Sequence, residues 1–480
     1  MLINKSQKLA PVLLSFLLFI SASCVPFPRV DPTNTPVDDP SEPTRMANHI
    51  TFGERSLASG QDFFVPLREK AIRAIAGGQD RVAIDSLNKY LENEPNDPEA
   101  RIFLNNLMVA ESDITYTIAV SVPIASNLNA SLEILRGVAH AQYELNESRG
   151  LNQGKLRVVI ANDDDKDPNN GTLVARQVAE ELSKNKEILG VVGPYSSDTS
   201  LDTAKIYERN KLVVISPIST SVELIGYSPY FFRTVPSDRV AARSLARYVQ
   251  TRSESFEVVA FYNSDSNYSK SLYQEFINEL GRLNVVLRDD PDCDLGTWPE
   301  DPQDWPNIAT RVLSKAKRNG ANMIMLAPSS GHLDKAIQIA LANKRELPIL
   351  AGDDVYSPDT IQQGKDSVVG MIVAVAWDIE ANSSNSSFPS RSKEIWGTSG
   401  VNWRTITAYD AVQALMSAID NQSKPTREGV REELSSPSFS TPGAIRRVQF
   451  DESGDYAGDI QLVKIQKRNS GYDFIPLDIN

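Results

Sequence analysis

The stretch that decides the fold is ILGVVGPYSS at residues 188–197, an apolar run that ends in Gly-Pro, a tyrosine and two serines. A second run of the same kind, VVISPISTSVEL, occupies residues 213–224, and a segment of helical character lies between them at 198–210. Short, almost continuous apolar strands separated by helices are typical of a parallel sheet that is covered by helices on both faces. The sequence therefore predicts an α/β fold.

The same alternation begins at residue 114 and falls into two series. Strand-like runs of the first series lie at 114–122, 156–161, 188–192 and 212–215. Those of the second series lie at 256–262, 285–287, 323–326 and 347–350, and a closing stretch adds runs at 368–376 and 446–465. Two series of this length predict two doubly wound, parallel-sheet lobes rather than one sheet.

Composition excludes several other classes of protein. The 480 residues are 41% hydrophobic and 23% charged, as in an ordinary soluble globular protein. The 49 basic and 62 acidic residues give a formal net charge of −13, which argues against binding to nucleic acid or to anionic lipid. Two cysteines and three scattered histidines offer neither a disulfide framework nor a zinc site. We expect no metal and no cofactor.

The first 23 residues predict an export signal. Lys5 and Lys8 precede the apolar run Leu9–Ile20, which is shorter than the about 20 residues that a membrane-spanning helix needs. The small residues Ser21–Ser23 lead directly into Cys24, an arrangement that resembles the lipobox of bacterial lipoproteins. The resemblance implies an exported protein, anchored to the membrane on the periplasmic face through a lipidated Cys24. The alternative is simple cleavage, which would leave a soluble periplasmic protein.

Two segments precede the large domain expected at 112–480. Residues 24–60 begin with a proline-rich stretch that is poor in large apolar groups, and we expect them to form an extended tether. Residues 61–111 show helical periodicity, and their second helix resembles that of a tetratricopeptide repeat. A single repeat is too short to be stable by itself, so we expect this helical module to pack on the large domain.

The ends of the predicted strands carry candidate binding residues. In open α/β sheets, ligands bind outside the carboxyl ends of the strands. Here those ends carry two serine-rich turns, Gly193–Ser197 and Ser216–Thr220, and each turn leads into a helix. Helix N-termini offer free N–H groups and a partial positive charge, so hydroxyls at these positions favour a small anion such as a carboxylate. The alternative is that Ser197 and Thr220 serve only as helix caps.

A more specific resemblance rests on six stretches that occur in the expected order. They are Ile134–Gly137, Leu156–Asp167 (LRVVIANDDDKD), Ile188–Ser197, Val213–Leu224, Phe232–Thr234 and Tyr409–Ala411. Through them, residues 114–480 resemble the periplasmic leucine/isoleucine/valine-type amino-acid-binding proteins, the class I solute receptors of ABC importers. The resemblance implies two lobes with a ligand cleft between them.

The resemblance also implies where the lobes begin and end. The first lobe would comprise about 112–236 and 377–445, and the second about 237–376 and 446–480. The lobes would close by a hinge motion about the crossover segments near Thr234–Ser237, Ala374–Trp377 and Ala444–Val448.

The family further implies which residues hold the ligand. A serine and a threonine in the two turns bind the α-carboxylate of the ligand, and Ser197 and Thr220 match them. The second lobe supplies a tyrosine, which matches Tyr268, and an acid for the α-ammonium, which falls on Asp353 or Asp354. The full predicted set is Tyr195, Ser196, Ser197, Ile218, Ser219, Thr220, Tyr268, Asp353 and Asp354.

These observations predict a receptor rather than an enzyme, because no typical catalytic arrangement is found. The resemblance implies capture of a small carboxylate-bearing ligand, first of all an amino acid, for delivery to an ABC permease. Few aromatic residues in the predicted pocket favour a smaller, more polar or broader ligand than leucine. Two alternatives stay open: a sensory receptor of the same fold, and a lipoprotein that activates a cell-wall synthase without binding a ligand. For Arg404 the sequence leaves two roles open, contact with an acidic group of the ligand and a surface ion pair, and it favours the surface ion pair.

The predicted anchor is testable on protein extracted from membranes. Mass spectrometry should find an acylated N-terminus at Cys24, because several acyl chains are needed for durable attachment to a bilayer. Cys24→Ser should release the protein without detergent. An unmodified N-terminus at another residue would contradict the prediction.

Overall fold

The computed structural model describes residues 48–58, 65–147, 154–164, 172–251, 255–378, 387–397, 401–469 and 471–477. All of the described residues belong to one compact unit. The predicted export signal, Cys24 and the first part of the predicted tether lie outside the described residues. Within the described ranges, no helix combines the length and the apolar character needed to cross a bilayer.

The first sheet has six strands in the order β1-β3-β2-β4-β5-β6. Their bounds are β1 Ile50–Thr51, β2 Thr115–Val122, β3 Lys155–Asn162, β4 Ile188–Val192, β5 Val213–Ser216 and β6 Phe231–Arg233. All neighbouring pairs are parallel except β1 with β3. The carboxyl ends of β2 to β6 therefore meet at one edge of the sheet, which is where the serine-rich turns begin.

Helices cover both faces of this sheet because successive strand residues point in opposite directions. Ile118 and Val120 belong to the same hydrophobic cluster as residues of the helices on one face. Ala119 and Val191 belong to the cluster of the helices on the other face. The helices of the first face are α5 (Leu128–Glu147), α13 (Phe388–Trp396), α14 (Trp403–Asp420) and α15 (Arg427–Leu434), and those of the second are α6 (Leu173–Lys184) and α7 (Ser197–Arg209). We call this sheet and its helices the first lobe.

Helices α5 and α14 make the most extensive helix pair of the first lobe. Gly137 on α5 permits their close approach, because a Cβ at this position would collide with the carbonyl oxygen of Thr405 on α14. The glycine of the Ile134–Gly137 stretch is thus required by packing.

The second sheet has seven strands in the order β15-β14-β11-β10-β9-β7-β8. Their bounds are β7 Val258–Tyr262, β8 Val285–Val286, β9 Met323–Ala327, β10 Ile349–Ala351, β11 Ile372–Val375, β14 Gln461–Arg468 and β15 Gly471–Pro476. Strands β7 to β11 are parallel, and the β14–β15 hairpin pairs antiparallel with β11. The two-residue strands β12 (Thr441–Pro442) and β13 (Arg447–Val448) form a separate pair.

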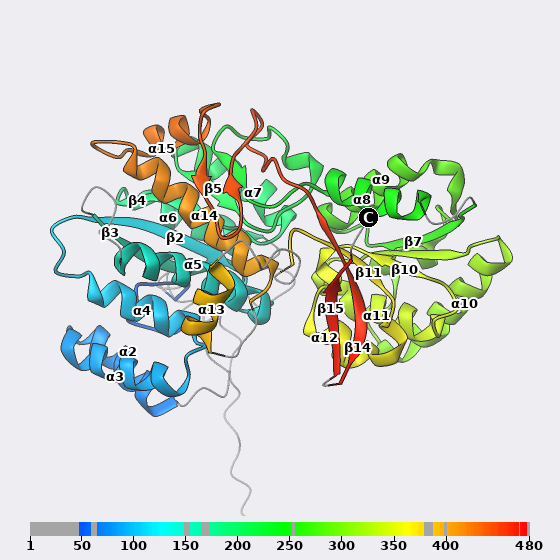
Figure 1. The fold of residues 1–480 in the computed structure, drawn as a ribbon, viewed down its shortest axis with the longest axis horizontal. Coiled ribbons are helices and arrows are strands. Elements are labelled where there is room, and N and C mark those ends of the chain that lie inside the picture. The colour runs from blue at the N-terminus through cyan, green and yellow to red at the C-terminus, as the bar shows by residue number, and fades with distance from the viewer. Residues whose placement is uncertain are drawn as a thin grey trace, which may run out of the picture. The chain divides into compact units, whose positions relative to one another are not determined.

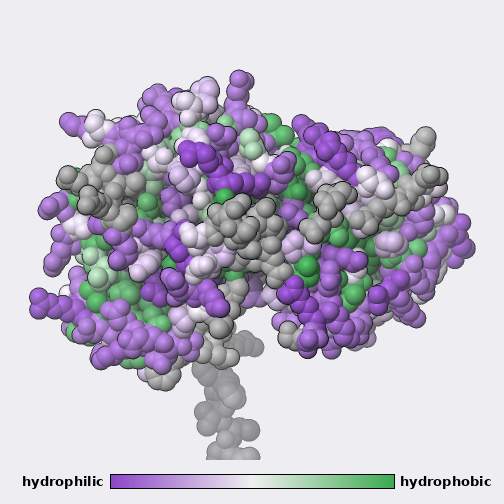
Figure 2. All heavy atoms as spheres, viewed as in Figure 1, coloured by the Kyte–Doolittle hydropathy of each residue, from purple (hydrophilic) through white to green (hydrophobic). Residues whose placement is uncertain are grey.

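Helices also cover both faces of the second sheet (Figure 1). They are α8 (Asp238–Gln250) and α9 (Asn267–Leu280) on one face, and α10 (Trp305–Arg318), α11 (Leu333–Asn343) and α12 (Pro358–Gly364) on the other. We call this sheet and its helices the second lobe. The outward surfaces of the helices are mostly hydrophilic in Figure 2. The predicted α/β fold with mostly parallel strands is confirmed.

The helical module consists of α2 (Val65–Ala76), α3 (Asp80–Asn93) and α4 (Pro98–Met108). Helix α2 packs on α3, α3 on α4, and α4 on α5 of the first lobe (Figure 1). Apolar residues such as Phe103 on α4 are fully buried in the cluster that also contains residues of α5. The module is therefore continuous with the core of the first lobe.

Part of the segment predicted to be a tether belongs to the first lobe instead. Ile50 and Thr51 pair with Ala161 and Ile160 as an antiparallel edge strand of the first sheet, and Thr51 is fully buried. The tether expected over 24–60 is thus wrong for residues 48–58. The physical reason is that the edge of β3 offers unpaired backbone groups, and a short strand satisfies them.

The third crossover between the lobes lies later than the predicted Ala444–Val448. Arg233 on β6 donates a backbone hydrogen bond to Gly454 (3.1 Å), and its Nη2 lies 2.6 Å from Oδ2 of Asp455. The chain thus remains on the first lobe through Asp455 and enters the second sheet only at Gln461. Because Arg233 is fully buried, its charge requires this long-range partner.

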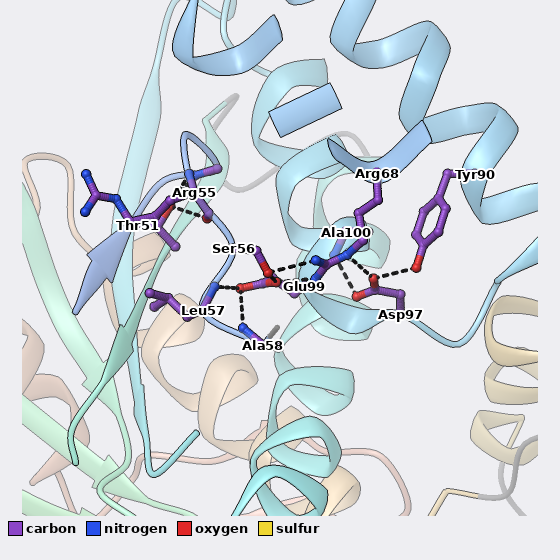
Figure 3. Close-up of polar contacts among 11 residues, drawn as sticks. Thr51, Arg55, Ser56, Leu57, Ala58, Arg68, Tyr90, Asp97, Glu99 and Ala100 are labelled. Atoms are coloured by element: carbon purple, nitrogen blue, oxygen red, sulfur yellow. Dashed lines mark hydrogen bonds and ion pairs between the residues drawn. The ribbon is translucent and has the colours of Figure 1, made fainter. Parts of the chain in front are cut away.

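A buried ionic cluster connects the helical module to the edge strand (Figure 3). Arg68 on α2 donates from Nε to Asp97 at 2.7 Å, and from Nη2 to Glu99. Both carboxylates are completely buried. Tyr90 on α3 adds a hydrogen bond of 2.9 Å to Asp97. One guanidinium therefore holds α2, α3 and the start of α4 together.

The second carboxylate of the cluster reaches the segment that follows β1. Glu99 accepts a hydrogen bond from the hydroxyl of Ser56 (2.7 Å) and others from the backbone N–H groups of Leu57 (2.7 Å) and Ala58 (3.3 Å). These bonds tie residues 56–58 to α4. Burial nevertheless raises the pKa of Glu99, and the positive charge of Arg68 opposes that shift.

Replacing Arg68 by methionine should lower the free energy of unfolding by about 3–5 kcal/mol, because two buried carboxylates would lose their cation. Chemical denaturation at neutral pH measures this. The matched control is Arg73→Met on the same helix, which removes an exposed pair with Glu69 and should cost about 0.5 kcal/mol or less. Equal effects of the two substitutions would contradict the prediction.

Candidate functional site

A cavity of about 290 Å³ lies where the carboxyl ends of the strands of both lobes meet. Its lining residues all follow strands β4, β5, β7, β9 and β10. The complete lining consists of Tyr195, Ser196, Ser197, Asp198, Ile218, Ser219, Asn263, Asp265, Ser266, Tyr268, Ser329, Ser330, Gly331, His332, Asp353 and Asp354. We call it the inner compartment. Every predicted binding residue except Thr220 lines it.

A larger cavity of about 770 Å³ shares a wall with the inner compartment. The shared residues are Tyr195, Ser330, Gly331 and Asp354. Its other walls come from the start of α5, the loop after β10, and the start of α14; they include Asn127, Glu133, Arg136, Tyr356, Asp359 and Arg404. We call this cavity the outer compartment.

The first serine-rich turn supplies the cap of α7. Ser196 is the N-cap of α7, and its hydroxyl accepts a hydrogen bond from the N–H of Thr199 (3.0 Å). Ser197 follows as the first helical residue, and its hydroxyl accepts a hydrogen bond from the N–H of Ser221 (3.2 Å). The cap of α7 is therefore Ser196, and Ser197 joins the two serine-rich turns.

The second turn is held by its own serines. Ser216 donates to the carbonyl of Pro194 (2.7 Å) and accepts from the N–H of Ser219 (2.9 Å). The hydroxyl of Ser219 donates in turn to the carbonyl of Tyr195 (3.1 Å). These bonds fix the two turns against each other.

Thr220 is placed differently from its prediction. Its side chain is buried but does not line the inner compartment. The hydroxyl lies beside the carboxyl of Asp238 and completes no hydrogen bond of good geometry within the described chain. A role for Thr220 in holding a carboxylate stays a prediction.

The second lobe presents a tyrosine and two acids. The hydroxyl of Tyr268 donates to Asp353 (2.5 Å) and accepts from the N–H of Asp354 (3.4 Å). Both acids belong to a short 3-10 helix that follows β10. Gly352 precedes them, and a Cβ there would collide with the Tyr268 hydroxyl and with Leu272. The glycine lets the tyrosine pack directly against the acids.

Three polar contacts connect the lobes around the cavities. The hydroxyl of Tyr195 donates to Asp354 (3.0 Å), the carboxylate of Asp198 accepts from the side-chain amide of Asn267 (2.7 Å), and Arg404 reaches the loop after β10. Arg404 Nη1 donates to the carbonyl of Tyr356 (3.0 Å), and its Nη2 lies 3.6 Å from the Asp354 carboxylate. The guanidinium also stacks over Trp403, 4.5 Å from the ring centroid.

The expected surface ion pair of Arg404 is therefore wrong, because the residue is only 5% exposed. Position alone did not reveal this: Arg404 stands in the first turn of α14, and only the tertiary structure brings that turn against the second lobe. The remaining lining residues that were not predicted, such as Asn263 and Ser330, follow strands β7 and β9. The feature that could have identified them in the sequence is their position directly after predicted strands.

The inner compartment is acidic. Its lining includes four aspartates and His332 but no lysine or arginine among the described residues. Burial and the neighbouring Asp354 carboxylate raise the pKa of Asp353 to about 7. Burial also raises the pKa of Asp354, while Arg404 opposes that shift. The pair is thus poised to accept a positively charged group in place of a proton.

The family of the chain follows from comparison with known proteins. A family model described as periplasmic binding protein matches residues 115–470. The chain belongs to the periplasmic binding protein family. The leucine-, isoleucine-, valine-, threonine- and alanine-binding protein of Pseudomonas aeruginosa is 22% identical over 348 residues, which are 71% of this chain and 87% of that protein.

Solved structures of the periplasmic binding protein family share the fold. An ABC transporter substrate-binding protein from Desulfitobacterium hafniense, in complex with leucine, matches with a TM-score of 0.62 and 22% identity over 75% of this chain and 100% of that chain. A solute binding protein from Rhodopseudomonas palustris, in complex with 3,4-dihydroxybenzoic acid, matches with a TM-score of 0.61 and 13% identity over 76% of this chain and 96% of that chain.

The raised pKa of Asp353 predicts how stability depends on pH. The pKa is about 7 in the folded protein and about 3.8 in the unfolded chain, so this group's contribution to folding is complete below pH 4 and is lost as the pH rises through 7. Asp353→Asn removes the ionisation but keeps an acceptor for Tyr268. It should raise the free energy of unfolding at pH 8 by on the order of 2 kcal/mol and flatten its decrease between pH 5 and 8.

Thermal unfolding across this pH range measures the effect. Asp238 also has a pKa raised to about 7 by burial, so part of the slope should remain. Asp334→Asn, at an exposed position of the same lobe, is the control and should keep the whole slope. A variant at position 353 with the wild-type slope would refute the assignment.

Proposed function

We propose that this protein captures a small solute with a carboxylate and an ammonium group, an amino acid in the first place, for an ABC permease. The observation that carries the proposal is the inner compartment, where hydroxyl and N–H groups of the first lobe face acids of the second across one cavity. The hydroxyl and N–H groups suit the carboxylate of a zwitterion, and the acids suit its ammonium group. The amino acids in the names of the relatives support the same class of ligand.

On the side of the first lobe, we propose that Ser197 receives the carboxylate. Its side chain lines the cavity at the first turn of α7, where free N–H groups and the helix dipole favour a negative charge. Tyr195, Ser196, Ile218 and Ser219 complete this wall. The N-cap role belongs to Ser196, which leaves the hydroxyl of Ser197 available for a ligand.

On the side of the second lobe, we propose Asp353 as the partner of the ammonium group. Asp354 already has a cationic neighbour in Arg404 and a hydrogen bond from Tyr195. Asp353 is held by the neutral hydroxyl of Tyr268, and its pKa is raised to about 7. An ammonium group would replace the proton that the raised pKa of Asp353 retains, and it would stabilise the ionised carboxylate.

The lining also bears on the size and polarity of the ligand. Ile218 is the one aliphatic side chain larger than alanine among the described residues of the inner compartment. Besides Ile218, a leucine side chain would find there only the rings of Tyr195, Tyr268 and His332 as apolar surface in the part of the chain that the structure describes. We therefore propose a polar amino acid whose side chain extends toward the outer compartment.

We propose that the lobes move about crossovers near residues 234–237, 374–377 and 456–460, and that a lipidated Cys24 anchors the exported protein. The spacing of a helix pair in the helical module resembles that of a tetratricopeptide repeat, and we propose that the module is related to these repeats. A cavity lined from both lobes is not needed by an activator that binds no ligand, so this alternative loses support.

The proposal is tested by measuring, with calorimetry, the affinities of the protein for a panel of amino acids. Ser197→Ala should weaken binding about ten- to hundredfold, since a hydrogen bond to a charged group contributes about 1.5–3 kcal/mol. The control is Thr426→Ala, which removes the cap of α15 far along the chain. It should lower stability by about 0.5–2 kcal/mol without changing affinity. Equal affinities of the Ser197 variant and the wild type would refute the proposed site.

A further inference from the structure

The outer compartment has an arginine on its wall that is only partly satisfied. Arg136 on α5 is 8% exposed, and its Nη1 lies 2.7 Å from Oε1 of Glu133. Its Nε donates to Oδ1 of Asn96 at 2.7 Å. No described residue accepts a hydrogen bond from its Nη2. A nearly buried guanidinium on the wall of this cavity is thus held through Nε and Nη1, while Nη2 has no described acceptor.

The residue that engages Nε comes from the helical module. Asn96 lies in the loop between α3 and α4, directly before Asp97. Asp97 caps α4 by accepting from the N–H of Ala100 (3.0 Å), and it is bound by Arg68 and Tyr90. The ionic cluster of the module therefore fixes the loop from which Asn96 reaches the first lobe.

The other partner of Arg136 is fixed as well. Glu133 accepts a hydrogen bond through Oε2 from the hydroxyl of Thr405 on α14 (2.7 Å). Thr405 adjoins Arg404, the second arginine of the outer compartment. Arg404 differs because the second lobe already occupies it through the Tyr356 carbonyl and Asp354. Within the described chain, Arg404 keeps only its buried Nε without a partner, so Arg136 is the arginine whose terminal nitrogen has capacity left for a solute.

We propose that the helical module is a working part of the ligand cleft: Asn96 is a positioning residue that orients Arg136 to accept an oxygen of the solute's side chain. This inference rests on the proposed function, because the α-groups of the amino acid would occupy the inner compartment. A guanidinium held at two edges loses less side-chain entropy when a ligand binds than a free one does. A carboxylate or amide oxygen is the chemistry that its open edge recognises.

Titration calorimetry of the full chain with L-glutamate, L-glutamine and L-leucine tests the inference. The wild type should bind glutamate or glutamine more tightly than leucine, and a preference between the first two separates a carboxylate from an amide. Asn96→Ala and Arg136→Met should each weaken the preferred ligand about tenfold and leave leucine unchanged. The double variant should be no weaker than Arg136→Met, because Asn96 acts only through the arginine.

Two further variants separate positioning from folding. Asn96→Asp keeps an oxygen for Nε and should restore the preference for the polar ligand. Asn93→Ala, at an exposed site of the same module, should change nothing. A wild type that prefers leucine would overturn the inference and the proposed polar ligand, but not the proposed capture of an amino acid. An Asn96→Ala variant with an unchanged ratio of affinities would overturn the inference alone. Absence of binding of all three probes would overturn both.

Discussion

The guanidinium of Arg404 is the interaction on which the cleft depends. Two adjacent aspartates end the β10 segment, and burial of both as anions would be prohibitive without a neighbouring cation. Arg404 supplies that charge from the first lobe and also binds the carbonyl of Tyr356. Tyr195 donates a hydrogen bond to Asp354, and Tyr268 donates one to Asp353. The acids can therefore stay buried at the interface of the lobes and remain responsive to a ligand.

The same principle governs the N-terminal half of the unit. Arg68 neutralises Asp97 and Glu99, and these in turn hold the segment after β1 and the loop that carries Asn96. A helical segment too short to fold alone thus gains a defined place on the first lobe. In this way a charge cluster distant from the cleft determines the geometry of a side chain on the cleft wall.

Much of the fold was predictable because strands buried on both faces leave an unbroken apolar pattern. Runs such as Ile188–Val192 are therefore visible without a structure, and so are the polar residues that follow them. Strand β1 was not predictable, because two residues carry no periodicity and owe their conformation to the edge of β3. The chain also remains packed on the first lobe as far as Asp455, because Asp455 pairs with Arg233, more than two hundred residues away.

The sequence by itself determined the two series of strands and the edge at which their polar ends gather, because parallel strands place those ends together whatever the details of packing. It also identified eight of the residues that line the inner compartment. Only the tertiary structure decided that Ser196 rather than Ser197 caps α7, that Thr220 is buried without lining the inner compartment, and that Arg404 is buried between the lobes. These outcomes depend on which distant groups meet at short range, and local patterns carry no information about that.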